Sequence, residues 1–262
     1  MTALQKFIKF AAIAFGVFLI ASVGLGILSL FTGTRDLSDE EVYEITLDKP
    51  VANRLEIELE GVELTVKTGE TLKLETNNKN VKAAIKDGEL KIQENSSWFN
   101  KTVNGKVLLT LPDMLIPRVS LEVGAGKVVI EKLTANFIEF DFGAGEALIN
   151  ELYAYQSAEI ECGAGKFTLS SGQVNNLDMD LGVGEVNFSA DAFGNSRIEC
   201  GVGKLNLTLG EKSDYQMELH KGIGAINVSG VAYEDNVTIG VGANKIRLDG
   251  GVGAIDVRFK EE

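Results

Sequence analysis

Apolar and polar residues alternate along most of the chain, and the alternation itself repeats about every 19 residues. Each repeat contains a Gly-x-Gly triplet, and positions are counted from its first glycine. Apolar residues stand at −3 and −1 with an acidic residue between them, as in Leu121-Glu122-Val123. Further apolar residues stand at +4 and +6, as in Val128 and Ile130. A period of two is typical of half-buried strands, so each repeat predicts two short strands.

The triplet between the two strands recurs eight times, at residues 124–126, 143–145, 163–165, 182–184, 201–203, 222–224, 240–242 and 251–253. Its second glycine lies where the alternation changes phase, so we expect a bend there that leaves no room for a β-carbon. The middle residue is small or apolar and is expected to face the core. A fixed period of this length is typical of repeat proteins, whose units bury their apolar faces against their neighbours.

Two architectures accommodate two strands per repeat: the stacked coils of a β-solenoid and an antiparallel meander of hairpins. Charges at position +3 alternate strictly in sign, in Lys127, Glu146, Lys166, Glu185 and Lys204. In-register stacking would place these opposite charges side by side, which is favourable, whereas a meander gives no reason for the alternation. We therefore predict an all-β, single-stranded β-solenoid of parallel stacked coils of about 19–20 residues with Gly-x-Gly corners, preceded by one transmembrane helix.

Position +5 predicts a polar column that hydrogen-bonds along such a stack. Its members are Thr168, Asn187, Asn206 and Asn227. The three asparagines also form Asn-x-Ser/Thr sequences, which we attribute to repeat geometry and not to glycosylation.

The N-terminal segment predicts a membrane anchor. Residues 10–31 carry no charge, are almost wholly apolar and are long enough to span a bilayer as a helix. A cleaved signal peptide is the alternative, but its apolar region is normally shorter, and Ala21-Ser22-Val23-Gly24 is a poor cleavage site. Lys6 and Lys9 place the N-terminus in the cytoplasm. We therefore expect a cytoplasmic tail (1–9), a signal anchor (10–31), an acidic linker (32–41) and an extracellular β domain (42–262).

Residues 42–120 lack clear triplets but keep the alternation, so we expect them to form an irregular N-terminal part of the β domain, before regular repeats at 121–262. The predicted strands are 42–47, 55–59, 62–66, 72–75, 90–92 and 107–111. The segment from Glu94 to Gly105 is expected to be a loop that carries Trp98 and Phe99. This aromatic pair fits either a cap over the core or an exposed binding tip.

An acidic residue at position −2 recurs in five units, as Glu122, Asp141, Glu161, Asp180 and Glu199. Glu218 extends this column if His220-Lys221 is an insertion. Stacked carboxylates repel one another, and a divalent cation could bridge them. A flat strand face offers fewer than the six to eight oxygens that calcium takes, so we expect the column to be hydrated and predict no metal site.

Charge and composition exclude other classes of function. Outside the first 31 residues, 23 Lys and Arg residues stand against 38 Asp and Glu residues, a formal charge of −15, which disfavours nucleic-acid binding. His220 is the only histidine, so a histidine-dependent triad has no second candidate. Cys162 and Cys200 stand at equivalent positions two repeats apart, too far for a disulfide, and indicate core residues. We predict no catalytic residue and no cofactor.

The segment from Val107 to Ile130, with a strand that ends in Leu111-Pro112 followed by strand, Gly-Ala-Gly and strand, resembles the putative-adhesin families of β-strand-repeat, domain-of-unknown-function proteins. These families are common in Gram-positive bacteria and are related to the C-terminal domain of LiaF-type envelope-stress regulators. The resemblance covers residues 42–262. It implies a β-helix-like solenoid, and it brings neither an agreed activity nor a catalytic motif.

Three classes of function remain. The first is a structural or adhesive envelope protein that contacts a wall polymer, an envelope protein or another cell. The second is an envelope-stress regulator that acts through a membrane partner, for which Gly16, Gly24 and Gly26 allow close helix approach. The third is a polysaccharide lyase, which the mostly uncharged residues at position +7 disfavour.

Overall fold

The computed structural model describes residues 42–47, 53–95 and 105–260. This part of the chain is all-β, with one large, mainly parallel sheet and a single 3₁₀ turn at Lys212–Asp214. No helix among these residues is long and apolar enough to cross a membrane. The predicted tail, anchor and linker (1–41) and the aromatic pair Trp98 and Phe99 lie outside the described residues.

Short strands precede the regular repeats: β1 (Tyr43–Ile45), β3 (Lys73–Thr76), β4 (Val81–Lys86), β5 (Glu89–Glu94) and β6 (Gly105–Leu111). The long strands are β2 (Arg54–Thr68), β7 (Leu115–Asn175), β8 (Leu177–Ser189), β10 (Asn195–Leu209) and β15 (Asn244–Phe259). The remaining strands are β9 (Asp191–Phe193), β11 (Tyr215–His220), β12 (Ile223–Val228), β13 (Val231–Tyr233) and β14 (Val237–Gly240).

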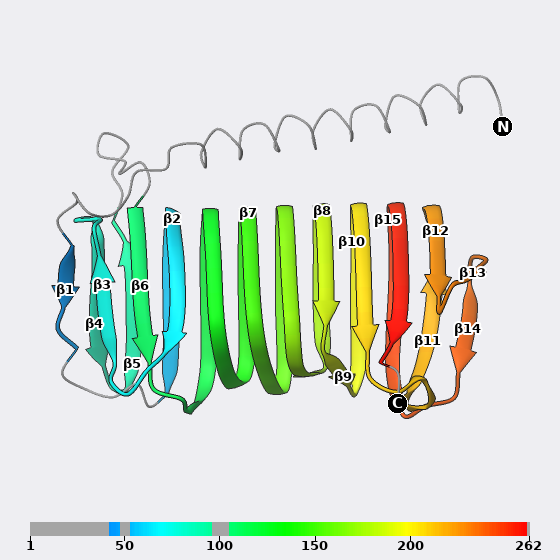
Figure 1. Ribbon diagram of the computed structural model, residues 1–262, viewed down its shortest axis with the longest axis horizontal. Helices are drawn as coiled ribbons and strands as arrows, with labels where there is room; N and C mark the ends of the chain where they lie inside the picture. The colour runs from blue at the N-terminus through cyan, green and yellow to red at the C-terminus, as the bar shows by residue number, and fades with distance from the viewer. Residues whose placement is uncertain (1–41, 48–52, 96–104, 261–262) are drawn as a thin grey trace, which may run out of the picture.

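Successive repeats pair in parallel with equivalent residues opposite one another. Lys166 lies opposite Glu185, and Glu185 lies opposite Lys204. The strands stand side by side in one row, and β7, which contains the first three triplets, bends back repeatedly to supply consecutive members of it (Figure 1). The predicted parallel, in-register stacking is therefore confirmed, and the antiparallel meander is excluded for these repeats.

The buried residues of the paired repeats form one common core. Residues at −3, −1, +4 and +6 are buried, as expected from the alternation, and Phe140, Phe167 and Phe188 are among the largest buried side chains. The ring of Phe142, at −1, packs on Phe167, at +4 of the next coil, with 6.1 Å between ring centroids. The middle residue of the triplet, as in Ala164, is only half-buried, because it lies on the bend between the two halves.

Regular stacking begins earlier than the sequence pattern indicates. Strand β2 pairs in register with the first repeat of β7, so that Gly61 lies opposite Ala125 and Val62 opposite Gly126. Glu60-Gly61-Val62 is therefore a corner without the Gly-x-Gly pattern. The backbone N–H groups of Glu60 and Gly61 donate to the carboxylate of Glu94, at 2.9 and 3.3 Å.

The last strand does not stack at the end of the array. Strand β15 lies between β10 and the pair β11 and β12, so the eighth triplet packs beside the fifth, and Gly253 lies opposite both Gly203 and Gly224. Figure 1 shows β15 between β10 and β12. The expectation that each unit stacks on the one before it is wrong here. The seventh triplet is not a corner of the parallel stack, because Gly240 ends β14, which pairs antiparallel with β11, and Val241 is 97% exposed.

Antiparallel strands close both ends of the stack. At the N-terminal end, β4 pairs with β5, β3 with β6 and β1 with β3. At the other end, β13 pairs with β12 and β14 with β11. These short strands cover the edges that would otherwise present long rows of unpaired backbone groups.

Candidate functional site

The predicted acidic column forms as a straight row along one face. Glu161 lies opposite Asp180, and Asp180 lies opposite Glu199. Glu58 joins the row beside Glu122 at one end, and Asp249 joins it beside Glu199 at the other. Glu122, Asp141, Glu161 and Asp180 are exposed, so water reaches these carboxylates from the open side.

A second acidic row runs parallel to the first, two residues earlier in each coil, and the sequence analysis missed it. Its members at −4 are Glu139, Glu159 and Asp178, all exposed. Side chains two residues apart on a strand share a face, so the two rows together form one flat acidic surface, which we call the acidic face. The same 19-residue period, applied to position −4, would have identified this row.

Basic residues stand at the two ends of the acidic face and not in its middle. At one end, the ammonium group of Lys91 lies 2.6 Å from Glu56 and 2.7 Å from Glu58, and this contact holds the pKa of the Glu56 carboxyl below its usual value. At the other end, Arg197 contacts Glu199. Within the described ranges, no three His, Cys, Asp or Glu side chains are placed to hold a metal ion.

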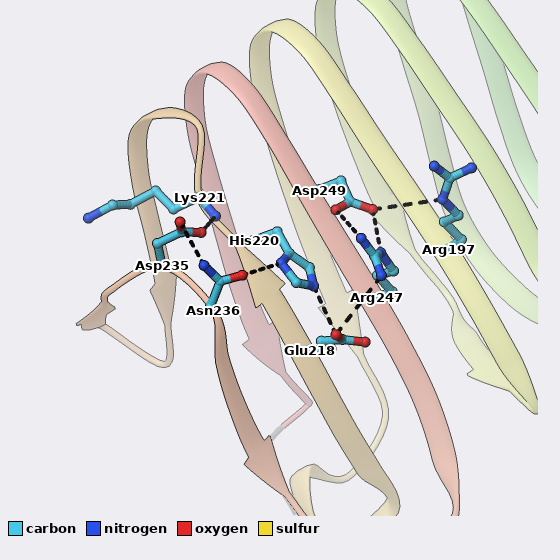
Figure 2. A network of polar contacts seen from close by, with 8 residues as sticks. All are labelled: Arg197, Glu218, His220, Lys221, Asp235, Asn236, Arg247 and Asp249. Atoms are coloured by element: carbon cyan, nitrogen blue, oxygen red, sulfur yellow. Dashed lines mark hydrogen bonds and ion pairs between the residues drawn. The ribbon is translucent and has the colours of Figure 1, made fainter.

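A network of polar contacts ends the acidic face at the C-terminal side (Figure 2). The guanidinium of Arg247 donates two hydrogen bonds to Asp249, at 2.8 and 3.1 Å, and these lower the pKa of the Asp249 carboxyl. Arg197 approaches the same carboxylate at 3.7 Å from β10. Glu218 lies 3.9 Å from Arg247 and 3.0 Å from the ring of His220.

The predicted extension of the acidic column to Glu218 is wrong. His220, and not Glu218, lies opposite Asp249, while Glu218 lies opposite Arg247. Strand β11 therefore pairs without an insertion, and the row at −2 ends in a histidine. The other ring nitrogen of His220 lies 2.9 Å from the side-chain oxygen of Asn236, in the connection between β13 and β14.

The charge ladder at +3 is longer than predicted. Lys106 lies opposite Glu63, and Glu63 lies opposite Lys127, so the alternation of sign begins two members before the first triplet. The ammonium of Lys127 is 3.8 Å from the carboxylate of Glu146. The ladder ends at β15, where Ala254 lies opposite Lys204.

The predicted polar column at +5 forms hydrogen bonds along part of the stack, and the amide of Asn187 donates to Glu185 and not to Thr168. The amide of Asn206 donates to Asn187 at 2.7 Å, and the amide of Asn227 donates to Asp256 at 3.0 Å. Asp256 takes its place in the column because β15 is inserted there. These bonds fix the register of neighbouring coils and offer no reactive group.

Cys162 and Cys200 are free and buried, as expected for core residues. Burial, with a smaller contribution from Asp141, raises the pKa of the Cys162 thiol to about 12. Burial also raises the pKa of the Cys200 thiol. Because the thiolate is the reactive form, burial disfavours reaction at both side chains.

Comparisons with known proteins agree with the predicted resemblance. A model of the DUF2807 family, described as "Putative auto-transporter adhesin, head GIN domain", matches residues 55–232. No curated protein matches the chain significantly.

Among solved structures, a putative cell adhesion protein from Clostridium sporogenes is 18% identical, with 84% of this chain and 99% of that chain covered and a TM-score of 0.36. A putative adhesin from Bacteroides fragilis is 13% identical, with 84% and 98% covered and a TM-score of 0.37. A putative adhesin from Parabacteroides distasonis is 15% identical, with 83% and 98% covered and a TM-score of 0.39.

Proposed function

The chain belongs to the DUF2807 family, and from this premise we propose that it is a membrane-anchored, extracytoplasmic β-solenoid with a structural or interaction role at the bacterial cell envelope. The role is non-catalytic and adhesin-like. The protein uses its repeated faces to contact a cell-wall polymer or another envelope protein.

The unbroken, in-register stack is the observation that carries this proposal. Parallel pairing from β2 to β15 turns each repeat position into a straight row, so the surface repeats the same chemistry about every 4.8 Å. Repeat proteins use such extended surfaces for binding. The side chains that recur most regularly, the acidic face and the charge ladder, are surface groups that suit contact with a long partner.

The proposed anchor is supported by the apolar run at residues 10–31 and by Lys6 and Lys9 before it. Protease added to intact cells should remove the β domain and a tag fused after residue 262, while a cytoplasmic marker stays intact. A C-terminal tag that survives on intact cells, and is cut only after lysis, would contradict this topology.

Contact with the envelope can be tested with the full chain in detergent, sedimented with isolated cell walls. We expect co-sedimentation that weakens when Glu139, Asp141, Glu159 and Glu161 are all replaced by glutamine, because these side chains lie at the centre of the acidic face. Equal sedimentation with and without walls would contradict the proposal. In that case, an altered envelope-stress response in cells that lack the protein would favour the regulator that acts through Gly16, Gly24 and Gly26.

A further inference from the structure

We infer that the inserted strand β15 is exchangeable between two copies of this chain, so that residues 244–259 of one copy fill the slot between β10 and β11–β12 of another. The partner is a second copy, and the exchange is reciprocal. This self-association goes beyond the proposed envelope role and does not depend on it.

The slot that holds β15 has β10 on one side and β11 with β12 on the other. We call these strands its two walls, and both precede β15 in the chain. On one side, β15 pairs with β10 from Asn195 opposite Lys245 to Leu209 opposite Phe259. On the other side, its first half pairs with β11 and its second half with β12. None of these contacts requires that the two walls and the inserted strand belong to the same molecule.

The slot fits this strand closely. Ile246, Leu248, Ile255 and Val257 are buried at 2% exposure or less. A β-carbon at Gly253 would lie 1.8 Å from the carbonyl oxygen of Gly203, so only glycine fits at that point of the slot. On the surface, Asp249 binds Arg197 of one wall, and Arg247 reaches Glu218 of the other (Figure 2).

The connection into the slot is short and crosses a strand. Strand β11 lies between β14 and β15, so residues 241–243 must span two strand spacings, about 9–10 Å. The connection packs directly on the start of β11: the backbone N–H of Gly242 donates to the carbonyl oxygen of Tyr215 at 3.2 Å, and a β-carbon at Gly242 would lie 2.0 Å from the carbonyl carbon of Asp214. A short connection under such constraint favours exchange, because in the exchanged form it can extend toward the second copy.

A copy whose own β15 has left the slot would expose an unpaired edge, and β15 of a second copy can cover that edge. Without β15, the whole length of β10 would present unpaired backbone groups beside exposed core residues such as Leu205 and Leu207. Such an edge is a template for another strand. Residues 244–259 fit this edge, because they match the glycine position, the buried residues and Arg197 of β10.

The test uses two full-length copies with different tags, expressed in the same cells. One copy carries Thr208→Cys and the other Arg258→Cys, at residues that lie opposite one another across the β10–β15 contact. The native cysteines are buried and remain in place. After mild oxidation of the whole lysate of these cells, we expect a disulfide-linked pair that carries both tags.

The matched control pairs Ser189→Cys in one copy with Thr208→Cys in the other. These residues lie opposite one another between β8 and β10, which are consecutive in the chain and are not exchanged. The exchanged pair should give about tenfold more linked product than this control, because a disulfide requires α-carbons within ~7 Å. Equal yields, or no linked product while a chain with both Thr208→Cys and Arg258→Cys links internally, would overturn the inference. A short Gly-Ser insertion after Val241 should lower the linked yield, and an unchanged yield would count against exchange through this connection.

Discussion

Gly165 lies so close to the carbonyl oxygen of Gly145 that a β-carbon on residue 165 would be 1.9 Å from that oxygen. Gly165 also has a φ of +140°, which side chains rarely allow. The same contact recurs one coil further, between Gly184 and Gly165. The second glycine of the triplet is therefore required twice over, by backbone conformation and by the distance between coils.

Replacement of Gly165 by alanine should destabilise the domain by about 2–4 kcal/mol, and valine should cost more, because the neighbouring coil must move to relieve the clash. Gly61→Ala is the matched control, since a β-carbon at Gly61 has no atom within 4 Å. Urea unfolding followed by circular dichroism measures both. Similar midpoints for the two variants would refute the steric account of the corner.

Lys166 occupies the charge ladder between Glu146 and Glu185. Lys166→Glu would place three like charges in line and should lower stability by about 0.5–2 kcal/mol, from two cross-strand pairs. Lys166→Ala separates the loss of attraction from the gain of repulsion, and high salt should shrink the difference between the variants. Identical denaturant midpoints at low salt would mean that the ladder contributes no energy.

Glu161, in the acidic column, is exposed and faces Asp180 across the strand contact. Glu161→Ala should be neutral or stabilise by a few tenths of a kcal/mol, because it relieves repulsion between like charges. Thermal melting with and without millimolar calcium measures this, and we expect the same result in both. Destabilisation by Glu161→Ala only in the presence of calcium would identify the column as a cation site instead.

Asp249 should give the stability of the C-terminal coils a dependence on pH. The hydrogen bonds from Arg247 hold its folded-state pKa below the unfolded value of about 3.9. Its contribution is therefore present above pH ~4 and is lost as the pH falls through the folded-state pKa. Asp249→Asn should cost about 0.5–1 kcal/mol at pH 7 and progressively less below pH 4. Urea midpoints at pH 7, 5 and 3 test this, and a constant difference would contradict it.

The local features of the fold could be predicted from the sequence because they repeat. The period located the corners at every triplet except the seventh, the alternation separated buried from exposed residues, and the signs at +3 indicated parallel stacking. The repeat pattern did not predict the corner at Glu60-Gly61-Val62, because the first corner of a stack can differ from the later ones. The carbonyl oxygen of Val62 lies close to Gly126 of the next coil. The side chain of Val62 lies on the other side, beside Gly105, so a valine fits at this corner.

The place of β15 could not be predicted from periodicity, because every coil offers its neighbours nearly the same pattern of buried and exposed residues. Pairing partners are then chosen by few residues, such as Asp249 with Arg197 and Asp256 with Asn227. One signal was present. The last two triplets are only 11 residues apart, too few for a coil of about 19. That spacing marks the segment where the chain turns back on itself.

The antiparallel strands at both ends have a consequence for how such a protein changes in evolution. Because β4 and β13 close the array, its length is set by the number of coils between them and not by further assembly at the ends. Duplication of two consecutive units within β7 would insert a pair of coils that keeps the alternation of charge at +3. The rod would lengthen by about 9–10 Å, with its ends unchanged. The reach of this protein can therefore be adjusted in uniform steps by a genetic event that leaves every terminal contact in place.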